Sequence, residues 1–140
     1  MLEPFIEPTD KSVAEYISQI DATKRQLDAQ LLQQLMTRVS GHEAVVWGEG
    51  VIGFGSYKNT HKTGRTWDWP VISYALEPGR LVVYAMTGFD NLERSLKQLG
   101  KNKISSHCLY IKTLSDVDMN VLESLVTTVY KEMHAKYECE

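Results

Sequence analysis

The chain has few of the features that would place it in a specialised class of protein. It has two cysteines in 140 residues, Cys108 and Cys139, too few for the disulfide framework of a small secreted domain. No apolar run approaches the roughly 18 residues that a membrane span needs, and residues 1–10 lack the basic segment of a signal peptide. These absences lead us to expect a cytoplasmic protein with no membrane partner.

The chain as a whole has fewer basic than acidic residues, but its bases are unevenly distributed. The formal net charge is −3, which argues against nucleic acid as a general partner. Residues 1–21 contain five acids and one base, whereas residues 94–112 contain five bases and no acid, and residues 56–66 are also free of acids. The uneven distribution leaves room for a local anion site, with ordinary solvated surface as the alternative.

Apolar residues at helical spacing predict two helices at the start of the chain. The first begins with an inner capping box formed by Ser12 and Glu15. The second begins at Asp21 or Thr23 and ends at Gly41. Its apolar face is predicted to carry Leu27, Leu31, Leu35 and Val39, widened by Leu32 and Met36.

After residue 43 the apolar residues no longer recur at helical spacing but alternate with polar ones, as in β-strands. Strands are predicted over 51–57, with Ile52 and Phe54 on one face, and over 66–76, with Pro70 at an edge or a bulge. Residues 59–64 are predicted to be a loop. A type II turn at 77–80 leads into a returning strand over 81–86, and a short strand covers 108–111.

Two further helices complete the pattern. The third begins with Asp90 and Glu93 and ends at Gly100. The last is capped by Ser115 or Asp116, and its predicted core stripe is Leu122, Leu125, Val126, Val129 and Met133. We therefore expect one domain over 1–140, with 1–8 as a candidate flexible tail. Its predicted class is α+β, with an antiparallel sheet of four to five strands, helices on one face and the order ααβββαβα.

Four separated motifs carry a resemblance to a known family. They are Trp47-Gly48, Gly53-Phe54-Gly55-Ser56-Tyr57, Leu99-Gly100-Lys101-Asn102-Lys103 and Cys108-Leu109-Tyr110-Ile111. In these, and from residue 13 to the last helix, the chain resembles the YdhG-like family, catalogued as domain of unknown function 1801. The resemblance implies a YdhG-like fold in a small, uncharacterised, bacterial cytoplasmic protein, and some members are labelled frataxin-like iron chaperones. Lys58 and Asn59 stand where many relatives have an aromatic residue, so no ligand specificity is carried over.

Residues 99–111 contain the main candidate site. Segments 53–57 and 99–111 are expected to pack near each other. Lys101 and Lys103 would hold a carboxylate or phosphate over the sheet face, with helix-end bases as the structural alternative. Aromatic and thiol side chains are expected to complete this ligand site: Tyr57, Trp67, Trp69, Cys108 and Tyr110.

Other chemical motifs are weaker. Gly48, Gly50 and Gly53 match G-x-G-x-x-G but lead into a strand, whereas a dinucleotide site needs a helix there. His107 and Cys108 are adjacent in a strand and therefore point to opposite faces, which favours an unreactive, buried thiol.

No compact metal-ligand spacing occurs. Iron held by acidic residues is the alternative that the frataxin-like label implies, with these candidates: Glu3, Glu7, Asp10 and Glu15.

Two hypotheses of function follow. The first is a non-enzymatic binding module that holds a small anionic molecule or a protein segment and needs no cofactor. The second is a frataxin-like intracellular iron-binding protein with an acidic surface. An enzyme that uses Cys108 or a tyrosine is less favoured, and a homodimer is left open. The charge around the pocket discriminates between the first two, because lysines favour an anion and clustered carboxylates favour iron.

Overall fold

The computed structural model describes residues 8–20, 22–48, 50–60, 63–64, 66–137 and 139, so nearly all of the proposed tail lies outside the described residues. The helices of this part are α1 (Val13–Ser18), α2 (Thr23–Ser40), α3 (Glu93–Leu99) and α4 (Met119–Lys136), with a short 3-10 helix, η1 (Leu114–Asp116). The strands are β1 (Val45–Trp47), β2 (Val51–Phe54), β3 (Tyr57–Thr60), β4 (Thr66–Trp69), β5 (Ile72–Glu77), β6 (Arg80–Tyr84), β7 (Lys103–Ile104) and β8 (Cys108–Ile111).

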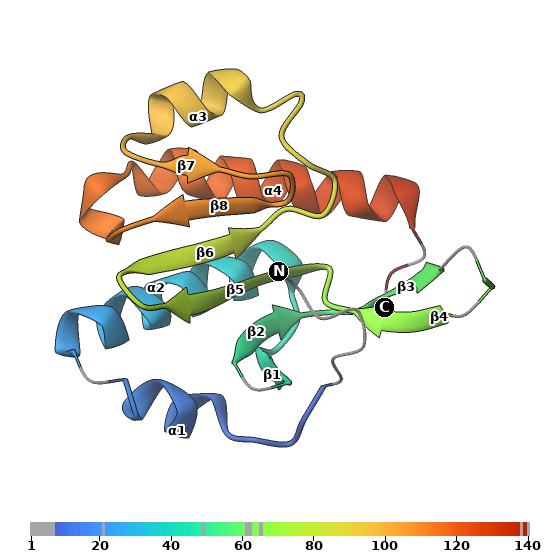
Figure 1. Ribbon diagram of the computed structural model, residues 1–140, viewed down its shortest axis with the longest axis horizontal. Coiled ribbons are helices and arrows are strands. Elements are labelled where there is room, and N and C mark those ends of the chain that lie inside the picture. Colours follow the sequence, from blue (N-terminus) through green and yellow to red (C-terminus); the bar gives the residue numbers. More distant parts are fainter. Residues whose placement is uncertain are drawn as a thin grey trace.

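Six of the strands form one antiparallel sheet in the order β1-β2-β5-β6-β8-β7. The remaining two, β3 and β4, pair only with each other and extend from one end of the molecule (Figure 1). The predicted α+β class with an antiparallel sheet is confirmed. The predicted count of four to five strands is wrong, and the described elements follow the order ααββββββαββα.

Two backbone breaks account for two of the extra strands. The predicted strand 51–57 divides at Gly55, whose φ of 69° bends the chain out of the sheet. The predicted strand 66–76 divides at Pro70, which has no N–H to give to a ladder. The main sheet resumes where the Val71 N–H donates to the Phe54 carbonyl at 3.2 Å. Between the two breaks, β3 and β4 form their own hairpin, so part of the predicted loop 59–64 is strand.

Helices α2 and α4 cover one face of the main sheet. In Figure 1 both lie behind β5, β6 and β8. Strand residues that point to this side are fully or almost fully buried in the main core, among them Ile52, Tyr74, Val83 and Leu109. The Tyr74 hydroxyl also donates to the carbonyl of Ala29 in α2 at 2.8 Å. The prediction that helices pack on one face therefore holds for the two long helices.

The opposite side of the sheet, which we call the open face, has a small apolar cluster of its own. Its members are Val51, Ala75, Val82, Tyr84, Met86, Cys108 and Tyr110. These residues come from strands and from the end of β6, and none belongs to a described helix. The alternation of side chains along each strand explains this, because each open-face residue neighbours a core residue in sequence.

The buried face of α2 is shifted from the predicted one. Leu32, Leu35 and Met36 are buried as predicted, but Leu27 and Leu31 are 53% and 44% exposed, and Ala29 is buried instead. Because apolar residues occur on two adjacent sides of α2, the sequence pattern alone does not determine which side is buried. Asp28, on the buried side, accepts hydrogen bonds from the Leu114 N–H and the Thr113 hydroxyl, and these tertiary contacts accompany this choice.

Several predicted turns and caps are confirmed. The Ser12 hydroxyl accepts from the Glu15 N–H at 3.2 Å at the start of α1. Gly41 ends α2 with a φ of 72°, and Gly79 has a φ of 76° in the turn between β5 and β6. A type II turn needs this conformation at its third position, so glycine is required there.

The predicted caps of the last two helices are wrong, although the predicted core stripe of α4 is right. Helix α3 begins after Leu92 rather than at Asp90. Residues 115–116 belong to η1, and α4 is capped by Asp118, whose carboxylate accepts from the N–H groups of the second and third helical residues at 2.9 and 3.3 Å. The five stripe residues of α4 are buried as predicted: Leu122, Leu125, Val126, Val129 and Met133.

Candidate anion-binding site

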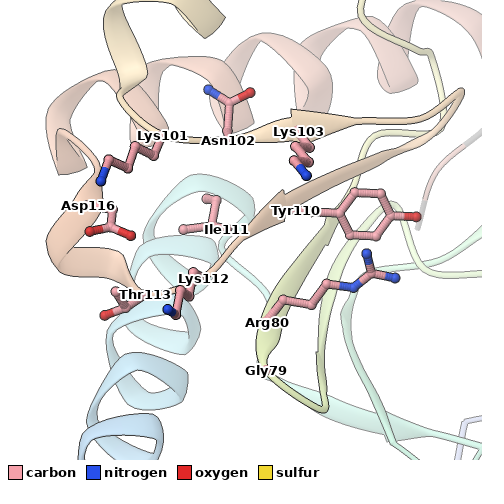
Figure 2. Close-up of a pocket in the computed structure, with 10 residues that line it drawn as sticks. All are labelled: Gly79, Arg80, Lys101, Asn102, Lys103, Tyr110, Ile111, Lys112, Thr113 and Asp116. Atoms are coloured by element: carbon pink, nitrogen blue, oxygen red, sulfur yellow. The ribbon is translucent and has the colours of Figure 1, made fainter.

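A groove of about 710 Å³ lies at one end of the main sheet, where the β5–β6 turn, the segment before β7, the end of β8 and η1 meet (Figure 2). We call it the basic groove. Its lining residues are Gly79, Arg80, Lys101, Asn102, Lys103, Tyr110, Ile111, Lys112, Thr113 and Asp116. Four of these residues are cationic, and Asp116 is the one carboxylate among them.

Strand register explains why cations from distant parts of the chain meet here. Lys103 pairs with Tyr110 across β7 and β8, so both side chains project on the open face. Lys112 lies two residues beyond Tyr110 and therefore projects on the same side. Arg80 begins β6 next to the pair formed by Leu81 and Ile111. The cationic side chains are exposed, so their charge is available to a ligand.

Arg80 is held in a defined orientation. Its Nε and Nη2 donate to the same oxygen of Glu77, Oε1, at 2.8 and 2.7 Å. Its Cζ lies 3.9 Å from the centroid of the Tyr110 ring, the arrangement of a cation–π contact. The Tyr110 hydroxyl is within 3.3 Å of the Ser105 hydroxyl. The guanidinium keeps further donors, those on Nη1, that neither contact uses.

The segment that carries Lys101 and Lys103 is anchored on both sides. Gly100 ends α3, as predicted, and also forms a β-bridge with Val117. The Asn102 side chain donates to the carbonyls of Leu96 and Gly100 at 3.1 and 2.8 Å. Figure 2 shows Asn102 directed away from the groove and Lys103 directed toward Tyr110 and Arg80. The two lysines therefore project from a fixed backbone.

The structure separates the other predicted aromatic residues from these lysines. Tyr57 and Trp69 face each other across β3 and β4 and are 3% and 2% exposed, and the half-buried Trp67 packs against the same core. The Tyr57 ring lies 4.7 Å from that of Tyr137 at the end of α4. None of the three lines the basic groove, so their expected place around Lys101 and Lys103 is wrong. Tyr110 is the aromatic residue there.

The expected proximity of segments 53–57 and 99–111 is also wrong, because β5 and β6 lie between them in the sheet. Gly53 makes room for side chains instead. A Cβ on this residue would lie 2.6 Å from Pro70 Cβ and 2.8 Å from Trp47 Cδ1. Gly48 and Gly50 belong to the turn that joins β1 to β2, which agrees with the prediction that this glycine pattern does not open a helix.

The two cysteines lie on different parts of the molecule. Cys108 is half-buried on the open face, where it pairs with Tyr84 across β8 and β6. The adjacent His107 is exposed. Cys139 lines a second cavity of about 540 Å³ together with Tyr57 and His134. Burial raises the pKa of the Cys139 thiol, which favours its protonated, less nucleophilic form.

The acidic candidates for iron can be followed only in part. Glu3 and Glu7 lie outside the described residues, and Asp10 and Glu15 are exposed. Within the described ranges, no group of three or more His, Cys, Asp and Glu side chains is arranged to hold a metal ion. Iron binding by the acidic residues therefore stays a hypothesis.

Comparisons with known proteins found no match to a family model, to a curated protein or to a solved structure. Membership of the YdhG-like family therefore stays a hypothesis that rests on the sequence motifs. In the part of the chain that the structure describes, no helix combines the length and the apolar character needed to cross a membrane.

Proposed function

We propose that the protein is a non-enzymatic binding module that holds a small oxyanion, a carboxylate or a phosphate, in the basic groove. The convergence of Arg80, Lys101, Lys103 and Lys112 on one groove carries this proposal. Charged hydrogen bonds from ammonium and guanidinium groups to oxyanions are roughly twice as strong as neutral ones. The lysines act as flexible point charges, and Arg80 adds a planar donor group.

The balance of charge around the groove supports an anion over a cation. Among the residues that line the groove, four are basic and only Asp116 is acidic. Glu77, which lies beside the groove, is already paired with Arg80. A divalent cation would be repelled by four positive groups, whereas an oxyanion would be attracted by them.

Calorimetric titration with inorganic phosphate tests the proposal. Replacement of both Lys101 and Lys103 by alanine should weaken phosphate binding by about tenfold or more, because two charged contacts are lost. The matched control replaces Lys131 and Lys136, which are exposed on α4 and do not line the groove. The control removes the same net charge and should change the affinity less than about twofold. Equal weakening in both variants would contradict the proposal.

We also propose, on the sequence motifs and composition, a YdhG-like fold and a cytoplasmic location, with a protein segment as the other occupant of this surface. The alternative function remains iron binding by the acidic N-terminal residues. Native mass spectrometry of protein purified without chelators separates these ideas. A retained organic anion supports the groove, a retained iron atom supports the alternative, and a bare protein argues against a tightly bound resident ligand of either kind.

A further inference from the structure

The basic groove continues into the apolar open face through one shared residue. Tyr110 lines the groove and is also a member of the open-face cluster. On one side of it lie the cations, and on the other side lie Val82 in β6 and Cys108 two residues earlier in β8. A molecule whose charged end occupied the groove would have apolar surface directly beside it.

The open face offers a limited apolar surface. Ala75, Val82 and Tyr84 are 7%, 0% and 7% exposed and form its floor. Partial exposure is confined to four members of the cluster: Val51, Met86, Cys108 and Tyr110. A stable protein interface buries about 800 Å² on each partner, contributed by about 20 residues. The small exposed apolar area therefore favours a small molecule over a protein surface.

From this juxtaposition we infer that the ligand is a small amphipathic anion, with a phosphate or carboxylate head and a short alkyl or aryl body. The inference rests on the proposed function and adds the apolar part of the ligand to it. The head group lies among the cations of the basic groove. The body lies over the exposed parts of Tyr110 and Cys108, along β8 away from the groove.

The Arg80–Tyr110 stack sits at the junction between head and body. Glu77 fixes the guanidinium beside the ring, so its unused Nη1 donors are available to the head group without a change in side-chain conformation. From Tyr110 to Cys108 the strand rises about 7 Å. A hexyl chain is long enough to cover this distance, whereas an ethyl group reaches little beyond the Tyr110 ring.

The test compares ethyl phosphate with hexyl phosphate by calorimetric titration of the whole chain. The two probes have the same head group and differ by four methylenes. Each methylene fully removed from water raises affinity by about fourfold. With the body partly covered, hexyl phosphate should bind at least about tenfold more tightly than ethyl phosphate. Affinities within twofold of each other would overturn the inference.

Alkylation of Cys108 by iodoacetamide gives a second readout. The Cys139→Ser variant leaves Cys108 as the single thiol of the chain. Saturating hexyl phosphate should slow its alkylation at least fivefold, and saturating ethyl phosphate should leave the rate unchanged, because only the longer body covers this side chain. Equal alkylation rates with both probes would overturn the placement of the body.

The two proposals fail in different ways. If ethyl phosphate binds in a manner that needs Lys101 and Lys103, but the hexyl chain adds no affinity, the anion site stands and the amphipathic ligand is wrong. If neither probe binds, both proposals are wrong. If hexyl phosphate gains affinity and the double lysine variant binds it equally well, the body binds without the groove, which also overturns the inference.

Discussion

Arg80 illustrates how a single side chain is prepared for an anion by neighbours that are not themselves ligands. Glu77 and the Tyr110 ring fix its guanidinium at the rim of the basic groove. Lysine at this position would keep the charge but lose the planar donor group and much of the ring contact. A side chain that must be ordered by the ligand binds it less tightly than one ordered in advance.

We therefore expect Arg80→Lys to weaken phosphate binding about five- to tenfold, as measured by calorimetric titration. Its effect on the free energy of unfolding should stay below about 1 kcal/mol, because the side chains of the ion pair with Glu77 are 46% and 38% exposed, so that water screens it. Arg38→Lys makes the same exchange at an exposed ion pair with Glu123, outside the groove, and serves as the control. Unchanged phosphate affinity in Arg80→Lys would show that the charge alone matters.

Gly100 is the backbone position on which the lysine segment depends. Its φ is 120°, and a Cβ would meet the carbonyl oxygen of Asp116 too closely for the backbone to stay in place. Gly41 is the matched control, because its φ is 72° and nothing lies within 4 Å of the added carbon. Gly41→Ala should cost about 1 kcal/mol of unfolding free energy.

Gly100→Ala should cost about 3 kcal/mol, because the backbone clash adds to the unfavourable φ. Urea unfolding measures both values. The bridge between Gly100 and Val117 must open to relieve the clash, so this variant should also bind phosphate more weakly. Equal destabilisation of the two alanine variants would contradict the role assigned to the Asp116 carbonyl.

At the scale of elements, Asp28 connects α2 to the segment that closes the groove. It is 6% exposed, and its Oδ2 accepts from the Leu114 N–H at 3.2 Å and from the Thr113 hydroxyl at 3.3 Å. The carboxylate thus binds the start of η1, where an N–H would otherwise be buried without a partner. The same contacts place the Asp28 side of α2, rather than the Leu27 side, against the rest of the protein.

We expect Asp28→Ala to lower the unfolding free energy by about 2–3 kcal/mol, because it leaves the buried Leu114 N–H without its acceptor. Asp28→Asn retains one oxygen acceptor and should cost less. Gln30→Ala, on the exposed side of α2, provides the control and should change stability by less than about 0.5 kcal/mol. Urea unfolding compares the three variants, and similar losses in all of them would contradict the capping role.

The elements also mark where sequence reasoning succeeds. The stripe of α4 has one apolar side, so its period identifies the buried residues. The proline and glycine of the β5–β6 turn identify a hairpin because few residues tolerate that geometry. In α2, however, apolar residues occupy two sides, and the contacts of Asp28 with residues 113–114 are too distant in sequence to be anticipated.

The same division applies to the candidate site. The acid-free run 94–112 pointed to Lys101 and Lys103, and the local alternation of β8 places Tyr110 on their side of the sheet. Arg80 was missed because its meeting with Tyr110 depends on the pairing of β6 with β8. Its position as the last residue of the predicted turn was the available signal. Tyr57 and Trp69 were assigned to the wrong place because Gly55 and Pro70 divert their strands into a separate hairpin.

On the scale of the whole molecule, buried tyrosines link stability to alkaline pH. Burial, with smaller effects of Cys108, Glu77 and Tyr110, raises the pKa of Tyr84 to about 12. Burial likewise raises the pKa values of Tyr57 and Tyr74 above the ordinary range. The unfolded chain releases these protons near pH 10, before the folded protein does.

The stability that these tyrosines contribute is therefore fully retained below about pH 10 and decreases as the pH rises toward 12. Each such tyrosine contributes about 1.4 kcal/mol per pH unit to the loss. Urea unfolding from pH 8 to pH 11 should show a flat region followed by a steep decline. Tyr84→Phe should make the decline shallower by one tyrosine's contribution, and a stability that is constant up to pH 11 would contradict the burial of these phenols.

The two edges of the main sheet have a consequence for the behaviour of the protein at high concentration. β7, at one edge, is two residues long and contains Lys103, and β1, at the other, is three residues long and is bridged by Pro8. Short edges with a lysine or a nearby proline are poor templates for the strands of another chain. Both edges of the main sheet thus resist aggregation. Lys103, which protects the β7 edge, is also one of the cations of the basic groove.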